Sequence, residues 1–197
     1  MNNQIWYKAS PVQNRMYVVN TKDTNSTSYN VTTVYSINGE YDLNSIKEAL
    51  ISVINNNSLM KAVFRDNNGT LEYTISDDTV NVDIIKCSNN YSKSEFKESI
   101  IKSFIKPFDM LKDILYRVMI GVYDEKNVYI ILDCHHSIFD GNCVKIFSEE
   151  FAAYYEKKSP NTKAEYDLFA DWQNNNVSSE DYASKCDFWK EKMQEKV

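Results

Sequence analysis

The chain has 197 residues, of which 43% are hydrophobic and 25% are charged, and its formal net charge is -6. This length suits one globular unit with its own core, and the composition excludes a disordered chain or a coiled coil. The charges are spread along the chain without a basic cluster, so neither nucleic acid nor a membrane surface is expected as a partner.

No targeting segment is evident. The first twenty residues show no cationic start followed by an apolar run, and no stretch approaches the ~20 apolar residues of a membrane span. The cysteines show no C-x-x-C pairing. These features predict a cytoplasmic protein with reduced thiols, at positions Cys87, Cys134, Cys143 and Cys186.

The first predicted elements are a strand and a helix. Residues 29–37 are rich in Val, Thr and Tyr and are closed by Asn38-Gly39, which is typical of a strand. Asp42 can cap a helix that ends at the run of three asparagines at 55–57. Its apolar residues fall on one helical face: Leu43, Ile46, Leu50, Val53 and Ile54.

Three short strands and a second helix follow. Residues 60–64, 71–75 and 80–85 predict strands, the first two joined by a turn at 67–69, and together they suggest a meander. Ser92 and Glu95 form a capping box for a helix of about thirteen residues, which Pro107 stops.

Two longer strands are predicted at residues 114–123 and 128–134. The second is apolar nearly throughout, which suits a central strand covered on both faces. The chain then turns through 135–141 into a helix that carries Val144, Phe147, Phe151 and Tyr154. From Glu165 on, helical spacing predicts helices outside the sheet, with Tyr182, Cys186, Trp189 and Met193 among their residues.

The only two histidines of the chain are adjacent and open the sequence His135-His136-Ser137-Ile138-Phe139-Asp140-Gly141. This is the pattern HHxxxDG, which chance would produce in roughly one chain in ten thousand of this length. Side chains alternate along a strand, so only one histidine can face a cleft. An imidazole held there can exchange protons near neutral pH, as a general base does.

The residues after the histidines predict a helix start. Asp140 can cap that helix or pair with a cation to fix the loop. Gly141 lets a backbone approach a ligand closely, and its N–H at the positive end of the helix can stabilise a developing oxyanion.

Three other interpretations of the motif stay open. Both histidines can be core residues, with Asp140 only a helix cap. A zinc site can use Cys134, Cys143 and the histidines, although the ligand spacing of a finger or ribbon is missing. Ser137 or Cys143 can act as a nucleophile activated by His136, although neither lies in a G-x-S-x-G motif.

The motif resembles that of the HHxxxDG acyltransferases, which include chloramphenicol acetyltransferase and the condensation domains of nonribosomal peptide synthetases. Further segments are similar to motifs of the condensation domains. In those domains a long segment follows the HHxxxDG motif, and here 56 residues follow Gly141. The segments are 10–17 (SPVQNRMY, similar to S-x-A-Q-x-R-L-W), 107–110 (PFDM, similar to P-F-D-L), 169–173 (FADWQ) and 188–190 (FWK).

The resemblance implies an α/β (α+β) two-layer sandwich, a chloramphenicol acetyltransferase-like lobe with a mixed, mostly antiparallel sheet and helices packed on it. It further implies that residues 1–197 are the N-terminal subdomain of a condensation domain. Such domains are V-shaped pairs of lobes. The second lobe is absent from this sequence, so we expect the isolated lobe to be inactive.

The implied reaction is amide bond formation between a carrier-bound donor thioester and the amine of a carrier-bound acceptor. His136 would act as general base or position the amine, His135 would be structural, Asp140 would be held in a salt bridge, and Gly141 would line the tunnel. The substrates would arrive on 4'-phosphopantetheine arms, with no intrinsically bound cofactor and no metal. The implied partners are the C-terminal lobe, donor and acceptor peptidyl carrier proteins and an adjacent adenylation domain.

The sequence also departs from the family pattern. The segment R-H-E-x-L-R-T-x-F corresponds to residues 56–64, which lack both arginines, so Arg15 or Lys61 remains as a partner of Asp140. Asn142-Cys143 after the motif leaves the subtype open. Two alternative functions are a stand-alone trimeric acyltransferase that uses acyl-CoA and a non-catalytic module that docks a carrier protein.

Overall fold

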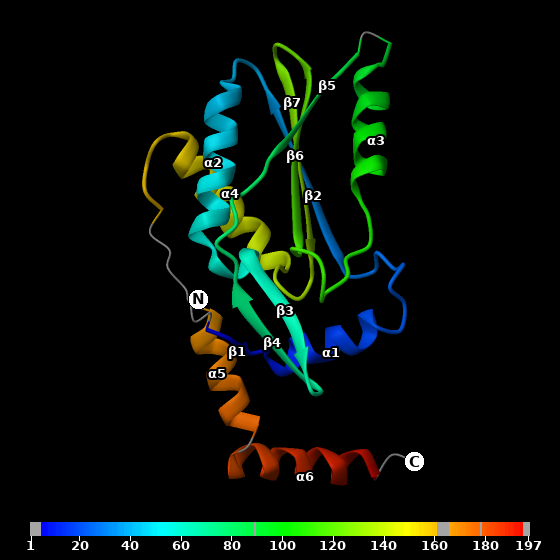
Figure 1. Ribbon diagram of the computed structural model, residues 1–197, viewed down its shortest axis with the longest axis vertical. Helices are drawn as coiled ribbons and strands as arrows, with labels where there is room; N and C mark the ends of the chain where they lie inside the picture. The colour runs from blue at the N-terminus through cyan, green and yellow to red at the C-terminus, as the bar shows by residue number, and fades with distance from the viewer. Residues whose placement is uncertain (1–4, 89, 161–165, 178, 195–197) are drawn as a thin grey trace.

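A computed structural model describes residues 5–88, 90–160, 166–177 and 179–194 (Figure 1). Its larger sheet has four strands in the order β2 (Asn30–Asn38), β7 (Asn127–His135), β6 (Tyr116–Asp124) and β5 (Asp83–Lys86). The first three are antiparallel, and β5 runs parallel to β6. The predicted central strand is therefore β7, and its last residue is the first histidine of the motif.

A smaller sheet has the order β1 (Tyr7–Lys8), β4 (Thr70–Ile75) and β3 (Ala62–Asn67). The predicted turn joins β3 and β4, with positive φ at Asn68 and Gly69. The predicted meander is wrong, because β5 crosses to the larger sheet. The strand expected from residue 60 starts two residues later, since η1 (Ser58–Lys61) forms a 3-10 turn there.

Helices cover both faces of the larger sheet (Figure 1). The even-numbered side chains of β7, from Val128 to Cys134, belong to a core shared with α2 (Leu43–Asn56) and α4 (Gly141–Tyr155). On the other face, Tyr129 and Ile131 pack with α3 (Lys93–Phe104). This explains the apolar run of β7, which has helices over both faces. The mixed α/β lobe is of the expected class.

A helix that the sequence interpretation missed is α1 (Pro11–Asn20). Its N-terminus has a complete capping box, in which Ser10 accepts from the Gln13 N–H and the Gln13 side chain accepts from the Ser10 N–H. Pro11 occupies the first helical position, where its missing N–H costs nothing. The pattern Ser-Pro-x-Gln was therefore the signal that could have found α1.

Two helices end the described chain. α5 (Tyr166–Val177) lies beside α1 and β1. α6 (Glu180–Gln194) runs across the bottom of the view, below both sheets (Figure 1). Among the described residues, α6 has no buried side chain. The prediction that these helices pack on the outside of the sheet is therefore wrong for α6. Glu165, from which the helical region was predicted, lies outside the described residues. No described helix has the length and apolarity needed to cross a membrane.

Candidate active site at the end of β7

The histidine pair is held by backbone hydrogen bonds to two different segments. The His135 N–H donates to the Leu115 carbonyl at 2.9 Å, and the His136 N–H donates to the Tyr29 carbonyl at 2.8 Å. Leu115 precedes β6 and Tyr29 precedes β2. The chain on either side of β7 thus fixes the backbone of both histidines.

The His135 side chain is 1% exposed and packs near the rings of Tyr29 and Phe108. Its Nδ1 lies 2.8 Å from Ser137 Oγ and accepts from the Ser137 N–H at 3.2 Å. Nδ1 is therefore an acceptor, which assigns the proton of the neutral ring to Nε2. Burial lowers the pKa of His135 to about 4, so the ring is neutral at pH 7.

The His136 side chain, in contrast, is exposed. Its ring lies edge-on to Tyr29, with centroids 6.5 Å apart. The strand β7 ends at His135, and His136 lies in the turn that follows it. His136 is thus the histidine of the pair that a bound molecule can reach.

The loop after the histidines is packed into the lobe. Ser137, Ile138 and Phe139 are buried, and the Ile138 N–H donates to the His135 carbonyl at 3.1 Å. Gln13 of α1 donates from Nε2 to the Ser137 carbonyl at 3.1 Å. The opening segment and the HHxxxDG motif, more than a hundred residues apart in sequence, therefore meet at this loop.

Asp140 caps α4, since its carboxylate accepts from the Cys143 N–H at 2.9 Å. This hydrogen bond is the main reason that the pKa of Asp140 is lowered. Within the described ranges, no ion pair joins Asp140 to Arg15 or Lys61. Arg15 is exposed. The Nζ atom of Lys61 lies 3.5 Å from Asn55 Oδ1. The exposed Gly141 begins α4, with open space where a Cβ would stand.

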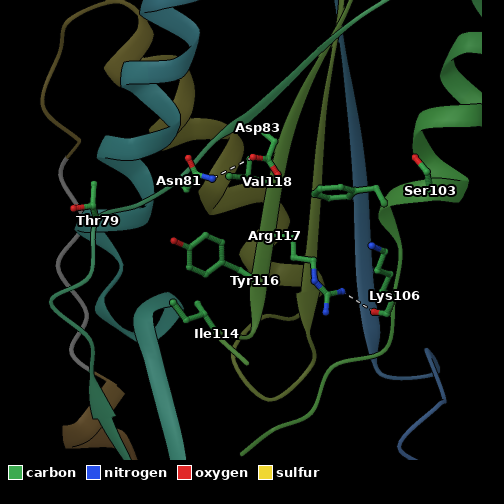
Figure 2. A pocket seen from close by; sticks show the side chains of 10 residues that line it. Thr79, Asn81, Asp83, Ser103, Lys106, Ile114, Tyr116, Arg117 and Val118 are labelled. Carbon is green, nitrogen blue, oxygen red and sulfur yellow. Dashed lines mark hydrogen bonds between the residues drawn. The ribbon is translucent and has the colours of Figure 1, made fainter. Parts of the chain in front are cut away.

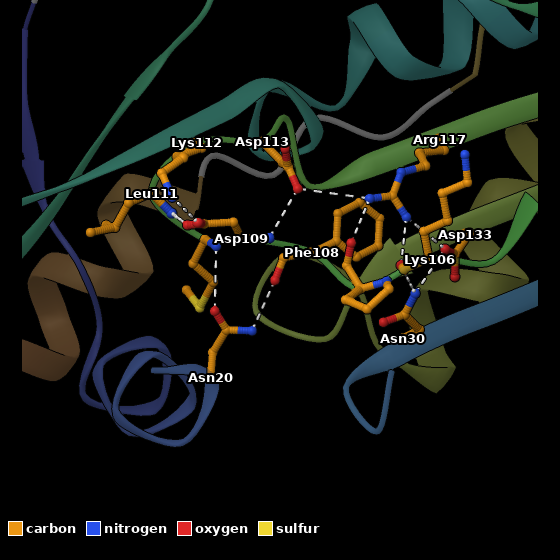
Figure 3. A network of polar contacts seen from close by, with 12 residues as sticks. Asn20, Asn30, Lys106, Phe108, Asp109, Leu111, Lys112, Asp113, Arg117 and Asp133 are labelled. Carbon is orange, nitrogen blue, oxygen red and sulfur yellow. Dashed lines mark hydrogen bonds and ion pairs between the residues drawn. The ribbon is translucent and has the colours of Figure 1, made fainter. Parts of the chain in front are cut away.

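A second polar group at this end of the sheet surrounds Asp133, which is fully buried (Figure 3). Its carboxylate accepts from Asn30 and Thr32, both at 2.8 Å, and pairs with Arg117 at 3.4 Å. Desolvation raises the pKa of Asp133 above its ordinary value. Sequence reasoning missed this group, although an acidic residue inside an apolar strand was a visible signal.

Arg117 connects that group to the segment before β6. It donates to the carbonyls of Lys106 and Pro107 at 2.7 and 2.8 Å, and its guanidinium lies 3.7 Å from the ring centroid of Phe108 (Figure 3). Phe108 in turn contacts the ring of His135. The Pro-Phe-Asp segment noted in the sequence is therefore part of the wall that buries His135.

An apolar cavity of about 400 Å³ lies behind the motif loop, between α4, η1 and α5. Its size falls in the range of ~300–1,000 Å³ typical of ligand sites. The motif contributes Ile138 and Phe139, and α4 contributes Cys143, Ile146 and Phe147. The remaining lining residues are Asn57, Ser58, Leu59, Met60, Tyr166 and Phe169.

Another pocket, of about 330 Å³, lies between β5, β6 and the end of α3 (Figure 2). It does not include the HHxxxDG residues among its lining. Arg117 reaches it, but that side chain is bonded to the backbone of Lys106 and Pro107. We assign no reaction to this pocket.

The two alternative chemistries of the motif find no support in this geometry. Within the described part of the chain, no group of three His, Cys, Asp or Glu side chains is placed to hold a metal ion. The Ser137 hydroxyl bonds His135 rather than His136. Burial raises the pKa of Cys143, which lowers the fraction of thiolate.

The lobe is a mixed α/β fold in which the HHxxxDG motif follows the central strand, with one histidine exposed and its neighbour buried. The chain belongs to the condensation domain family, whose model matches residues 3–197.

Relatives and solved structures agree with this assignment. The chain is 30% identical to surfactin synthase subunit 2 of Bacillus subtilis over 188 residues and 28% identical to gramicidin S synthase 2 of Brevibacillus brevis over 190 residues. The two alignments cover 94% and 96% of this chain but only 5% and 4% of the respective synthetases.

The structure is similar to the starter condensation domain of rhizomide synthetase RzmA, with a TM-score of 0.85 at 15% identity. That match covers 95% of this chain and 48% of the other. It is also similar to the X-domain from teicoplanin biosynthesis, with a TM-score of 0.74, covering 90% of this chain and 39% of the other. At such low identity, these two likenesses show the fold alone.

Proposed function

We propose that this chain is the N-terminal lobe of a condensation domain and supplies the histidine at which a carrier-bound thioester and an amine are joined. The observation that carries the proposal is the separation of the pair, with His135 buried and His136 exposed. A rigid strand end presenting one titratable ring is what a positioned proton acceptor requires.

The residues around His136 have distinct parts in this proposal. His136 accepts the proton of the attacking amine, or orients that amine, as the nitrogen bonds to the thioester carbonyl carbon. The thiol of the carrier arm then leaves. His135, neutral and bonded to Ser137, fixes the loop. Asp140 holds the start of α4 through the Cys143 N–H, and the exposed Gly141 N–H lies at the positive end of that helix.

We further propose that both substrates come on 4'-phosphopantetheine arms of donor and acceptor carrier proteins, and that an adenylation domain loads the acceptor. Tethering holds amine and carbonyl close together, which lowers the entropic part of the barrier. A second lobe would form the other wall of the site, because His136 faces solvent in this lobe. We place the reaction in the cytoplasm.

The test is amide formation from loaded donor and acceptor carriers by a polypeptide that joins this lobe to the second lobe. Replacing His136 by Ala is expected to slow the reaction by 10²- to 10⁴-fold, the usual contribution of general acid–base catalysis. Replacing the exposed Lys145 of α4 by Ala is the control and should leave the rate unchanged. Product formation at an unchanged rate by the His136→Ala polypeptide would contradict the proposal.

A further inference from the structure

A pocket of about 240 Å³ is formed by residues of β1, β4, η1 and the first turn of α5. Its lining does not include any HHxxxDG residue, although Tyr166 lines both this pocket and the apolar cavity behind the motif loop. Its aromatic wall consists of Tyr7, Tyr73 and Tyr166, and Asp167 is the one charged side chain among the described residues that line it. The pocket therefore combines aromatic rings with a carboxylate, outside the candidate active site.

The hydroxyl of Tyr73 has no hydrogen-bond partner among the described residues, although Tyr73 is only 1% exposed. The ring of Tyr7 stacks on that of Tyr73 with centroids 5.5 Å apart, and the ring of Tyr166 meets it edge-on at 6.4 Å. The Tyr166 hydroxyl is bonded to Ser10 instead. A buried hydroxyl without a partner is destabilising, so a ligand that bonds it would gain affinity.

The charge near this hydroxyl is negative. Burial is the main reason that the pKa of Tyr73 is raised, and the carboxylates of Asp167 and Asp171, one turn apart on α5, raise it further. Within the described part of the chain, neither carboxylate has an ion-pair partner. The site therefore favours a cation over an anion.

The residues of the pocket suit an organic cation. The faces of aromatic rings attract cations that lie within about 6 Å of the ring centroid. No three His, Cys, Asp or Glu side chains of the described residues are placed to hold a metal ion. A protonated primary amine has three N–H donors, which match the acceptors that Asp167 and Tyr73 offer.

We propose that this pocket binds a primary alkylammonium group, with the nitrogen between the Asp167 carboxylate and the Tyr73 hydroxyl and the carbon chain against the tyrosine rings. Since Tyr73 is buried, the partly exposed ring of Tyr7 shifts when the ammonium group enters. The proposal goes beyond the proposed function and does not depend on it, because it involves neither a thioester nor His136.

A pair of ligands tests the need for charge. The 197-residue chain is titrated at pH 7 with n-butylammonium chloride and, separately, with n-butanol, a neutral molecule of similar size, and the backbone amide shifts are followed by NMR. Butylammonium should bind at least about tenfold more tightly, since only the cation gains from the carboxylates and the ring faces. Equal affinities, or shifts that lie away from Tyr7, Tyr73 and Asp167, would overturn the proposal.

A pair of charge variants tests the location. Asp167→Asn should weaken the binding of butylammonium about tenfold, because it removes the charged acceptor. Glu191→Gln removes the same charge from an exposed position of α6 that does not line the pocket, and should leave the affinity unchanged. Equal affinities of the two variants would overturn the proposal.

A third variant tests the unpaired hydroxyl. Tyr73→Phe keeps the ring, so it should not lower the free energy of unfolding without ligand, and it should weaken the binding of butylammonium about fivefold. Tetramethylammonium has the same charge but no N–H donor, so its affinity should not change in Tyr73→Phe. A loss of stability in this variant, or an equal loss of affinity for both cations, would contradict the part assigned to the hydroxyl.

A competition experiment distinguishes two sources of the alkylammonium group. 1,4-Diaminobutane represents a free amine, and Nα-acetyl-lysine methylamide represents a lysine side chain of a polypeptide. Tighter binding of the diamine would assign the pocket to a free amine, and tighter binding of the lysine derivative would assign it to a polypeptide. If neither compound displaces butylammonium, the proposal is wrong.

Discussion

Arg117 of β6 and Asp133 of β7 are direct cross-strand partners, with Nη1 and Oδ2 3.4 Å apart. Asp133 lies two residues before His135 on the same face of β7, and Arg117 also holds the segment that covers His135. The pair therefore joins the strand that carries the histidines to the chain that buries one of them.

Replacing Arg117 by Met should destabilise the lobe by about 3 kcal/mol, because the fully buried carboxylate of Asp133 would lose its cation. The free energy of unfolding in urea measures this. The double variant Arg117→Met/Asp133→Asn should recover at least half of the loss, since it leaves no buried charge. Additive losses in the double variant would show that Arg117 acts through its backbone hydrogen bonds instead.

The stability of the lobe should depend on pH through His135. The pKa of His135 is about 4 when folded and 6.5 when unfolded, so between these values the unfolded chain binds more protons. The free energy of unfolding is therefore unaffected by the titration of His135 above pH 6.5. It decreases as the pH falls from 6.5 toward 4, by on the order of 3 kcal/mol in total.

Urea titrations at several pH values can isolate this effect. His135→Gln should be less stable than the wild type at pH 7 and should show a flatter slope between pH 4 and 6.5. Thr24→Ala, at an exposed uncharged position, is the control and should keep the wild-type slope. If the His135→Gln variant keeps the wild-type slope, groups other than His135 determine the pH dependence of the free energy of unfolding between pH 4 and 6.5.

Asp140 should act in stability as a helix cap. Asn accepts the same hydrogen bond from the Cys143 N–H, so Asp140→Asn should cost little, whereas Asp140→Ala should cost about 1 kcal/mol. Thermal unfolding monitored by circular dichroism distinguishes the two. Arg15→Ala and Lys61→Ala should each leave the melting temperature unchanged. A lower melting temperature in either variant would support the ion pair with Asp140 that the sequence predicted.

The two capping boxes should differ in strength. Ser10 is fully buried and also bonds Tyr166, whereas Ser92 is exposed. Ser92→Ala should cost about 1 kcal/mol, and Ser10→Ala should cost more, about 2 kcal/mol, since it also leaves a buried hydroxyl without its partner. Tyr166→Phe should account for part of the difference, and equal losses at Ser10 and Ser92 would speak against the buried contact.

A side chain at Gly121 of β6 should force Ile100 of α3 to move. A Cβ at this position would overlap Ile100 Cδ1 of α3, so Gly121→Ala should cost roughly 1–3 kcal/mol. Ile100→Val in the same chain should relieve part of this cost by removing the overlapping methyl group. Chemical denaturation of the two single variants and the double variant measures the coupling, and a coupling of zero would rule out this contact as the cause.

Local patterns predicted most elements of the fold. The apolar run of β7, the cap at Asp42 and the box at Ser92 each specify a strand or a helix from neighbouring residues. The partner of β5 was not predictable in this way, because β5 is paired with a strand more than thirty residues away. The missed helix α1 did carry a local signal in Ser10, Pro11 and Gln13.

The sequence by itself determined which residues form the candidate site, since the spacing of the HHxxxDG motif marks them. Only the tertiary structure decided which histidine is buried, that Gln13 holds the Ser137 carbonyl, and that Asp133 meets Arg117. The reason is physical. The motif lies within seven consecutive residues, whereas burial and hydrogen-bond partners depend on segments that come together only when the sheet and its helices pack.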